Sequence, residues 1–136
     1  LPVLQAQDLI DVITGCMLLI VNDYEFNLIM DKTGLTKEKL LALAEATIIT
    51  LGEAGSELYT ETGKLTIPSF KAARVVDPTG AGDAYRGGLL SGLQNGDDLK
   101  TSAIQGSVCA SFAVECNGTQ VYSFSPEEFG NRLRAN

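Results

Sequence analysis

The stretch Val76–Gly88, with the sequence VDPTGAGDAYRGG, places turn-forming residues directly before a pattern that is typical of a helix. Four of the chain's fourteen glycines fall within this stretch, together with one proline and two aspartates. Glycine lets successive backbone N–H groups point into one concavity, and a helix N-terminus adds positive potential there. The turn Gly80–Gly82 is therefore predicted to bind an anion such as a phosphoryl group.

Two other phosphate-binding motifs are excluded by the same sequence. The only Gly-Lys pair is Gly63-Lys64, and Leu58 stands where a P-loop needs its first glycine. The dinucleotide fingerprint G-x-G-x-x-G fails because Tyr85 holds the place of its third glycine. Neither motif therefore describes the turn.

Asp83, in the first turn of the predicted helix, has two interpretations. It caps the helix and favours its dipole, or it accepts a proton from a substrate hydroxyl while the glycine N–H groups hold a phosphoryl group. The chain has no histidine, so a proton acceptor has to be a carboxylate, a lysine or a thiolate. An aspartate with an ordinary pKa of ~3.9 is a weak base, which phosphoryl transfer tolerates. The residues alone leave both interpretations open.

The composition predicts a soluble globular protein of one domain. The 136 residues are 45% hydrophobic and 20% charged, with a net charge of −7. An acidic chain lacks the basic face that nucleic acids need, and its apolar runs are too short to span a membrane. No secretory signal is visible at the start of the sequence. The three cysteines (Cys16, Cys109 and Cys116) have no C-x-x-C spacing, which favours buried free thiols in the cytoplasm.

Apolar runs and periodic segments alternate along the chain. Strands are predicted at 16–21 and 46–51, followed by a hairpin of 57–60 and 64–67. Helices are predicted at 4–14, from 22 to about 30, after the cap Thr36, at 82–94, at 99–116 and after the cap Ser125. This alternation predicts an α/β fold with a mostly parallel sheet flanked by helices.

The longer stretch DPTGAGDAYRGGLLSGL resembles the C-terminal signature D-T-x-G-A-G-D of the ribokinase-like family, also called the PfkB carbohydrate kinases. Pro78 stands where many members have threonine. The resemblance implies that Asp83 is the catalytic base. It also implies that Gly80, Ala81 and Gly82 form the anion hole for the transferring phosphoryl group.

Two further stretches resemble family motifs in the same order. VNDYEFNLI is similar to the N-x-x-E motif, so Asn22 and Glu25 are expected to organise Mg²⁺ and phosphate, often through water. Both residues follow a buried strand, where open α/β sheets place ligands, although a simple helix cap with an acid in the first turn would look the same. TLGEAGSELY resembles the T-x-G-x-x-G element, so Thr50, Gly52 and Gly55 are expected to line the ATP site.

The resemblance implies ATP and Mg²⁺ as cofactors and, in many members, a K⁺ ion held by carbonyl groups. Ser107 is expected to approach the adenine. By position, the candidates for the K⁺ site are Asp77, Thr79, Ala113 and Gly118.

The resemblance covers nearly the whole chain but only the second half of the family. Residues 1–136 are thus expected to form the C-terminal, ATP-binding and catalytic part of a three-layer αβα ribokinase-like fold, without the N-terminal half and lid. The motif wording, including the terminal GTQVYSFSPEEF, is most similar to the bacterial adenosine kinase-like or nucleoside kinase-like branch. Because the acceptor-binding residues would lie upstream, this part is expected to be inactive alone. Its unpaired sheet edge would invite association, for instance as a homodimer.

The leading expectation is an ATP-dependent kinase that phosphorylates a hydroxyl of a nucleoside or sugar, with an adenosine-like nucleoside favoured. The alternative is a non-catalytic nucleotide-binding fragment or module without an acceptor site. A plain α/β domain whose glycines only make turns is the third reading. The acceptor stays open among adenosine, another nucleoside, ribose, fructose and a keto-deoxy sugar acid.

Overall fold

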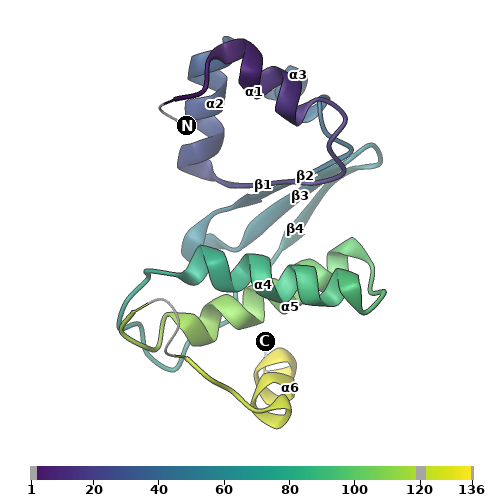
Figure 1. Ribbon diagram of the computed structural model, residues 1–136. Coiled ribbons are helices and arrows are strands. Elements are labelled where there is room, and N and C mark those ends of the chain that lie inside the picture. Colours follow the sequence, from purple (N-terminus) through teal and green to yellow (C-terminus); the bar gives the residue numbers. More distant parts are fainter. Residues whose placement is uncertain (1–2, 119–121, 136) are drawn as a thin grey trace. The chain divides into compact units, whose positions relative to one another are not determined.

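The computed structural model describes residues 3–118 and 122–135. The chain forms two compact units, which are described separately (Figure 1). The first contains the residues up to Gly52 together with Ser56–Thr66, and the second contains Glu53–Gly55 and the residues from Ile67 onward. Of the GTQVYSFSPEEF stretch, residues 119–121 lie outside the described ranges. The structure describes Gly118 and the part that begins at Tyr122.

A four-stranded sheet with the order β1-β2-β3-β4 forms the first unit. Strand β1 (Leu19–Asn22) pairs in parallel with β2 (Ala46–Thr50), whereas β2 pairs in antiparallel with β3 (Ser56–Thr60). Strand β4 (Gly63–Ile67) completes the sheet beside β3. The α/β class is confirmed: β1 and β2 pair in parallel as expected, whereas β3 runs antiparallel to β2. The short connection after β2 cannot carry the crossover that a parallel neighbour requires, so the chain reverses.

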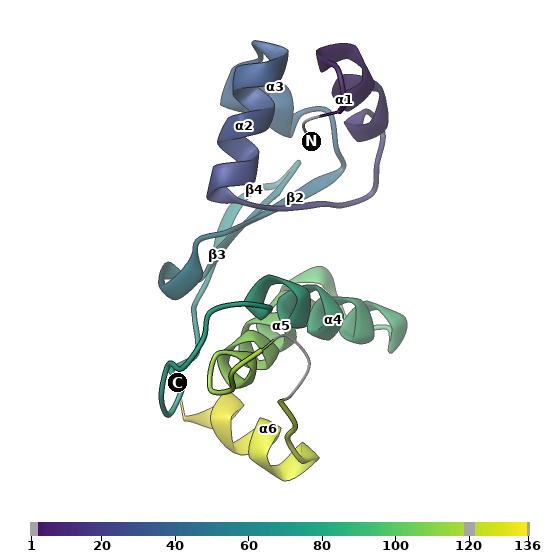
Figure 2. The ribbon, with the colours of Figure 1, turned by 60° about the vertical axis from the view of Figure 1, so that its left-hand side comes forward.

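Three helices lie on one side of this sheet, as Figures 1 and 2 show: α1 (Ala6–Ile13), α2 (Asp23–Thr33) and α3 (Lys37–Leu41). Their apolar side chains meet those of β1 and β2 in a core of buried residues. This core is composed of Ile13, Val21, Phe26, Ile29, Leu40 and Ile49. Removing such side chains from water supplies most of the stabilisation of a unit of this size.

Strand β1 begins later than the apolar run Cys16–Val21 predicts. The carbonyl of Cys16 accepts a hydrogen bond from the N–H of Glu45 at 2.9 Å, and the side chain of Met17 is 77% exposed. The first half of the run thus serves as an entry loop, which hydrophobicity alone does not distinguish from a strand.

The second unit is helical: α4 (Ala81–Gln94) packs along α5 (Leu99–Ala113), and α6 (Pro126–Arg134) follows. Glycines permit the close approach of α4 and α5. A Cβ atom at Gly88 would lie 2.8 Å from Sγ of Cys109 and 2.9 Å from the carbonyl oxygen of Gln105. A Cβ atom at Gly106 would lie 2.6 Å from the carbonyl oxygen of Tyr85.

Helix α6 begins as predicted, with Ser125 as its N-cap and Pro126 in the first turn. Aromatic side chains connect the segment before it to α5: the rings of Phe112 and Phe124 stack at 4.6 Å, and those of Phe124 and Phe129 lie 5.8 Å apart. Among the described residues, no helix is long and apolar enough to cross a membrane.

Helix α5 ends at Ala113, three residues short of the predicted Cys116. A helix that continued through Cys116 would need the amides of Glu115 and Cys116 to bond carbonyls four residues earlier. They donate instead to the carbonyls of Phe112 and Ala113, three residues earlier, at 3.2 and 3.4 Å, so the last turn tightens and the α-helix ends. The carbonyl of Val114, which a longer helix would use, accepts from the N–H groups of Val76 and Asp77 at 2.7 and 3.2 Å.

Candidate active site

The turn Gly80–Gly82 forms the N-terminus of α4 in the second unit. Gly80 is the N-cap residue, with a left-handed backbone (φ 85°), and it offers no side chain to cap the helix. The N–H of Ala81 donates to the carbonyl of Pro78 at 3.2 Å. The amides of Gly82 and Asp83 lie in the first turn of α4, where no helical carbonyl precedes them, and neither donates to another described residue. These two amides and the helix dipole are the groups with which the turn is predicted to bind an anion.

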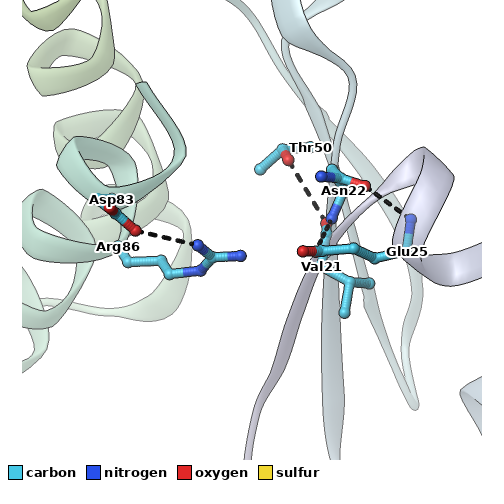
Figure 3. A network of polar contacts seen from close by, with 6 residues as sticks. All are labelled: Val21, Asn22, Glu25, Thr50, Asp83 and Arg86. Carbon is cyan, nitrogen blue, oxygen red and sulfur yellow. Dashed lines mark hydrogen bonds and ion pairs between the residues drawn. The ribbon is translucent and has the colours of Figure 1, made fainter. Parts of the chain in front are cut away.

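Asp83 is the third residue of α4, and its side chain is 79% exposed. It makes no capping hydrogen bond, so the capping interpretation keeps only its effect on the helix dipole. Figure 3 shows Arg86, one turn later, with Nη1 3.4 Å from Oδ1 of Asp83. Sequence reasoning missed Arg86, although its i+3 spacing from an acid was a usable signal. The accessible carboxylate suits a group that has to meet a substrate.

Asp77 is placed quite differently from Asp83. Its Oδ1 accepts from the N–H of Thr79 at 2.9 Å and its Oδ2 from the N–H of Gly118 at 3.2 Å. Hydrogen bonds from Thr79, through its hydroxyl and its amide, and then from Gly118 lower the pKa of the Asp77 carboxyl. Asp77 therefore braces the anion turn against the segment after α5.

The N-x-x-E residues lie in the first unit, where α2 follows β1. Oδ1 of Asn22 accepts from the N–H of Glu25 at 2.7 Å, and Oε2 of Glu25 accepts from the N–H of Asn22 at 2.9 Å. This reciprocal pair is a capping box. Asn22 also stands in register with Thr50, whose hydroxyl donates to the carbonyl of Val21 at 3.5 Å (Figure 3). Asn22 and Thr50 thus lie together at the carboxyl ends of the two parallel strands, as predicted for a ligand edge.

Gly55 and Ser107, two expected ATP-site residues of the second unit, both contact the segment around Pro68. A Cβ atom at Gly55 would lie 2.2 Å from the carbonyl oxygen of Ile67, and φ is 89° there, so only glycine fits. The buried hydroxyl of Ser107 donates to the carbonyl of Pro68 at 2.8 Å. Gly52 belongs to the first unit, and its φ of 58° also favours glycine.

The expected Mg²⁺ site fits only one mode of binding. No group of three metal-ligating His, Cys, Asp or Glu side chains occurs among residues 3–118 and 122–135. One oxygen each of Asn22 and Glu25 already accepts a backbone hydrogen bond. Mg²⁺ commonly keeps several waters and takes its remaining ligands from substrate phosphates and one or two carboxylates, so a water-mediated role fits these residues better than direct chelation.

The expected K⁺ residues are only partly brought together. The carboxylate of Asp77 joins Thr79 and Gly118, as described above. The carbonyl of Ala113, however, accepts from the N–H of Cys116 at 3.4 Å. Asp77, Thr79 and Gly118 thus lie together, and the hydrogen bonds between them hold the loop before α4.

A nest of amides at a helix N-terminus is a geometry that suits a phosphoryl group. The comparisons with known proteins give the family. Residues 1–127 match the model of the pfkB family carbohydrate kinases. The chain belongs to this family.

Individual proteins to which the chain is similar include nucleoside kinases and an inositol kinase. The chain is 38% identical over 120 residues to a nucleoside kinase of Methanocaldococcus jannaschii, a match that covers 88% of the chain and 40% of the relative. It superposes with a TM-score of 0.93 and 36% identity on the Burkholderia thailandensis nucleoside kinase solved with inosine, over 98% of the chain and 44% of that protein. An inositol 3-kinase of Arabidopsis thaliana is 41% identical over 68 residues, 50% of the chain and 19% of the relative.

The chain spans less than half of the length of each of these relatives. The partial ribokinase-like fold is therefore confirmed. These matches show what share of each relative the chain covers. They do not bear out the expectation that the chain corresponds to the C-terminal half of the relatives.

Proposed function

We propose that the protein containing this chain transfers the γ-phosphoryl group of ATP to a hydroxyl of a nucleoside or sugar, with an adenosine-like nucleoside favoured. The observation that carries this proposal is the N-terminus of α4, where the unbonded amides of Gly82 and Asp83 adjoin an exposed carboxylate. Membership of a kinase family and similarity to two nucleoside kinases support the choice of reaction and acceptor.

In this proposal the Gly80–Gly82 turn holds the γ-phosphoryl oxygens as charge builds on them. The acceptor hydroxyl oxygen bonds to the γ-phosphorus, the bond from that phosphorus to the β,γ-bridging oxygen breaks, and ADP leaves. Asp83 takes the hydroxyl proton and later releases it to water. Positioning and charge stabilisation dominate such reactions, so a carboxylate of ordinary basicity suffices.

The remaining assignments are parts of the same proposal. Mg²⁺ would neutralise phosphate charge and be held through water by Asn22 and Glu25. Thr50, Gly52, Gly55 and Ser107 would shape the nucleotide site, although the Ser107 hydroxyl already has a backbone partner. The exposed position of Asp83 and the bonded state of Asp77 support the base role for Asp83 alone.

The test replaces Asp83 with Asn in the encoded protein, which keeps the side chain's size and removes its basicity. Glu127→Gln is the matched control, because Glu127 is also an exposed acid in the first turn of a helix, α6. We expect the Asp83→Asn variant to lose about 10²–10⁴-fold in kcat while calorimetry still detects ATP binding. Near-normal turnover by this variant would remove Asp83 as the base.

A second function is nucleotide binding without catalysis, which the unbonded amides at the start of α4 would also support. Calorimetry with Mg-ATP beside an assay of ATP consumption with a panel of nucleosides and sugars separates the two functions. Binding without turnover by every acceptor would support the binding module. Turnover with one acceptor would identify the substrate.

A further inference from the structure

The segment before the anion turn is anchored at several points to the end of α5. The N–H of Ala73 donates to Oε1 of Glu115 at 2.7 Å. The amides of Val76 and Asp77 donate to the carbonyl of Val114, and the Asp77 carboxylate accepts from Gly118. The loop residues that make these contacts all precede Gly80 in the chain. The contacts therefore hold the segment that leads into α4.

One carboxylate oxygen links this segment to the last helix. Oε1 of Glu115, which accepts from Ala73, also lies 2.6 Å from Nη2 of Arg132 in α6. The two side chains are only 18% and 16% exposed, so water screens their attraction less than it would at an open surface. The Glu115–Arg132 ion pair is therefore stronger than a fully exposed pair, which contributes little to stability.

The guanidinium group of Arg132 is itself fixed from two further sides. Its Nη1 donates to the hydroxyl of Ser111 at 3.2 Å. Its central carbon lies 3.6 Å from the centre of the Phe112 ring, a cation–π contact. A planar guanidinium held by three neighbours is a rigid support for Glu115, which a flexible lysine could not reproduce.

We propose that Glu115 and Arg132 are positioning residues that hold the Gly80–Gly82 turn in its anion-binding conformation, acting through the amide of Ala73. The effect of this positioning on catalysis rests on the proposed kinase function, whereas its effect on the order of the loop does not. The competing explanation is that the pair only docks α6 onto α5.

The first experiment measures amide hydrogen exchange in the Arg132→Gln variant, with Arg134→Gln as control. Arg134 is an exposed arginine of the same helix, and its Nη2 donates to Oδ1 of Asn131 at 2.7 Å. We expect the amides of Ala73, Val76 and Asp77 to exchange about tenfold faster or more in Arg132→Gln, while those in the middle of α4 keep their rates. Faster exchange confined to α6, or equal acceleration throughout the second unit, would overturn the proposal.

Two further variants keep the test decisive if Arg132→Gln folds poorly. Arg132→Lys preserves the charge but not the planar fork, and we expect intermediate exchange rates for the three loop amides. Glu115→Gln keeps an oxygen for Ala73 while removing the ion pair. If the two residues act as one unit, the double variant should accelerate loop exchange no more than either single change; additive acceleration would contradict this.

The last measurement is steady-state kinetics of the same variants with the best acceptor. Positioning of the anion turn predicts a fall in kcat of about tenfold, with the KM of the acceptor changed by less than about twofold. An unchanged kcat in a variant whose loop amides exchange faster would overturn the catalytic consequence. A wild-type protein without any turnover would instead count against the proposed function and leave the exchange result standing.

Discussion

The two aspartates of the Val76–Gly88 stretch share a sequence neighbourhood but not an environment. Asp77 accepts hydrogen bonds with both carboxylate oxygens, whereas Asp83 is largely exposed beside Arg86. Carboxylates that are satisfied by backbone N–H groups generally hold a loop in place, and accessible ones are free to meet a ligand. The structure thus separates a supporting aspartate from a candidate catalytic one.

The bonded state of Asp77 predicts an acid-sensitive loop. Its pKa is lowered in the folded protein by the hydrogen bonds from Thr79 and Gly118, so its contribution to loop order is complete above the usual pKa of about 3.8. That contribution should disappear as the pH falls through the lowered value. We expect the amide resonances of Thr79 and Gly118 to shift together in an NMR titration, with a midpoint below 3.8.

The Asp77→Asn variant is the control for this titration. It retains a side-chain oxygen for one N–H donor but has no proton to gain, so the common midpoint of the two amides should vanish. A midpoint at or above the usual carboxyl value in the unmodified protein would show that the two hydrogen bonds do not favour the charged form.

At the scale of the element, the glycines around the start of α4 have two separate tasks. Gly80 takes the left-handed backbone that lets the chain enter the helix, while Gly88 lies against α5. The sequence could not distinguish these tasks, because both glycines stand in one crowded motif. Only the position of α5 shows that Gly88 serves helix packing.

Alanine at Gly88 should destabilise the protein, because its Cβ would lie 2.8–2.9 Å from Cys109, Gln105 and Gly106. We expect a loss of about 1–3 kcal/mol in the free energy of unfolding, measured by denaturant titration. Gly87 is the matched control, since a Cβ atom there meets nothing within 4 Å. Gly87→Ala should instead stabilise the helix by about 0.5–1 kcal/mol. Equal effects of both changes would contradict the packing role of Gly88.

Most helices and strands were predictable because their signals are local. The caps Asn22, Thr36 and Ser125 all accept the expected first-turn amide. The late start of β1 has a non-local cause, because Cys16 bonds to Glu45. Hydrogen bonds to partners distant in the chain leave no periodic pattern in the sequence.

The same division applies to the candidate site. The turn at Gly80 and the strand-end position of Asn22 followed from motifs and from general rules for α/β sheets. Glu115 and Arg132 carried no signal in the sequence, since an acid after one helix and an arginine near the end of another are ordinary for surface residues. Their importance depends on one shared oxygen, which only the folded second unit reveals.

For the whole molecule, the net charge of −7 decides how an anion can be attracted. The net negative charge opposes the approach of nucleotides, and in the proposed site the attraction would come from short-range amide dipoles at the start of α4. We expect the affinity for ADP without metal to change by less than about threefold between 0.02 and 0.2 M NaCl, because salt screens the general repulsion as well as the local attraction. A steep loss with salt, as seen for polycationic sites, would show by calorimetry that lysines and arginines dominate binding.

The carbonyl of Val114 has one consequence beyond anchoring. It is the acceptor that α5 would use to grow by another turn, and the N–H of Gly118 is the matching donor, yet both are engaged by the segment that leads into α4. Loop order and helix length are thus alternatives drawn from the same hydrogen-bonding groups. Releasing the loop would free α5 to lengthen. Loosening of the segment before the Gly80–Gly82 turn should therefore increase the helical signal in circular dichroism rather than reduce it.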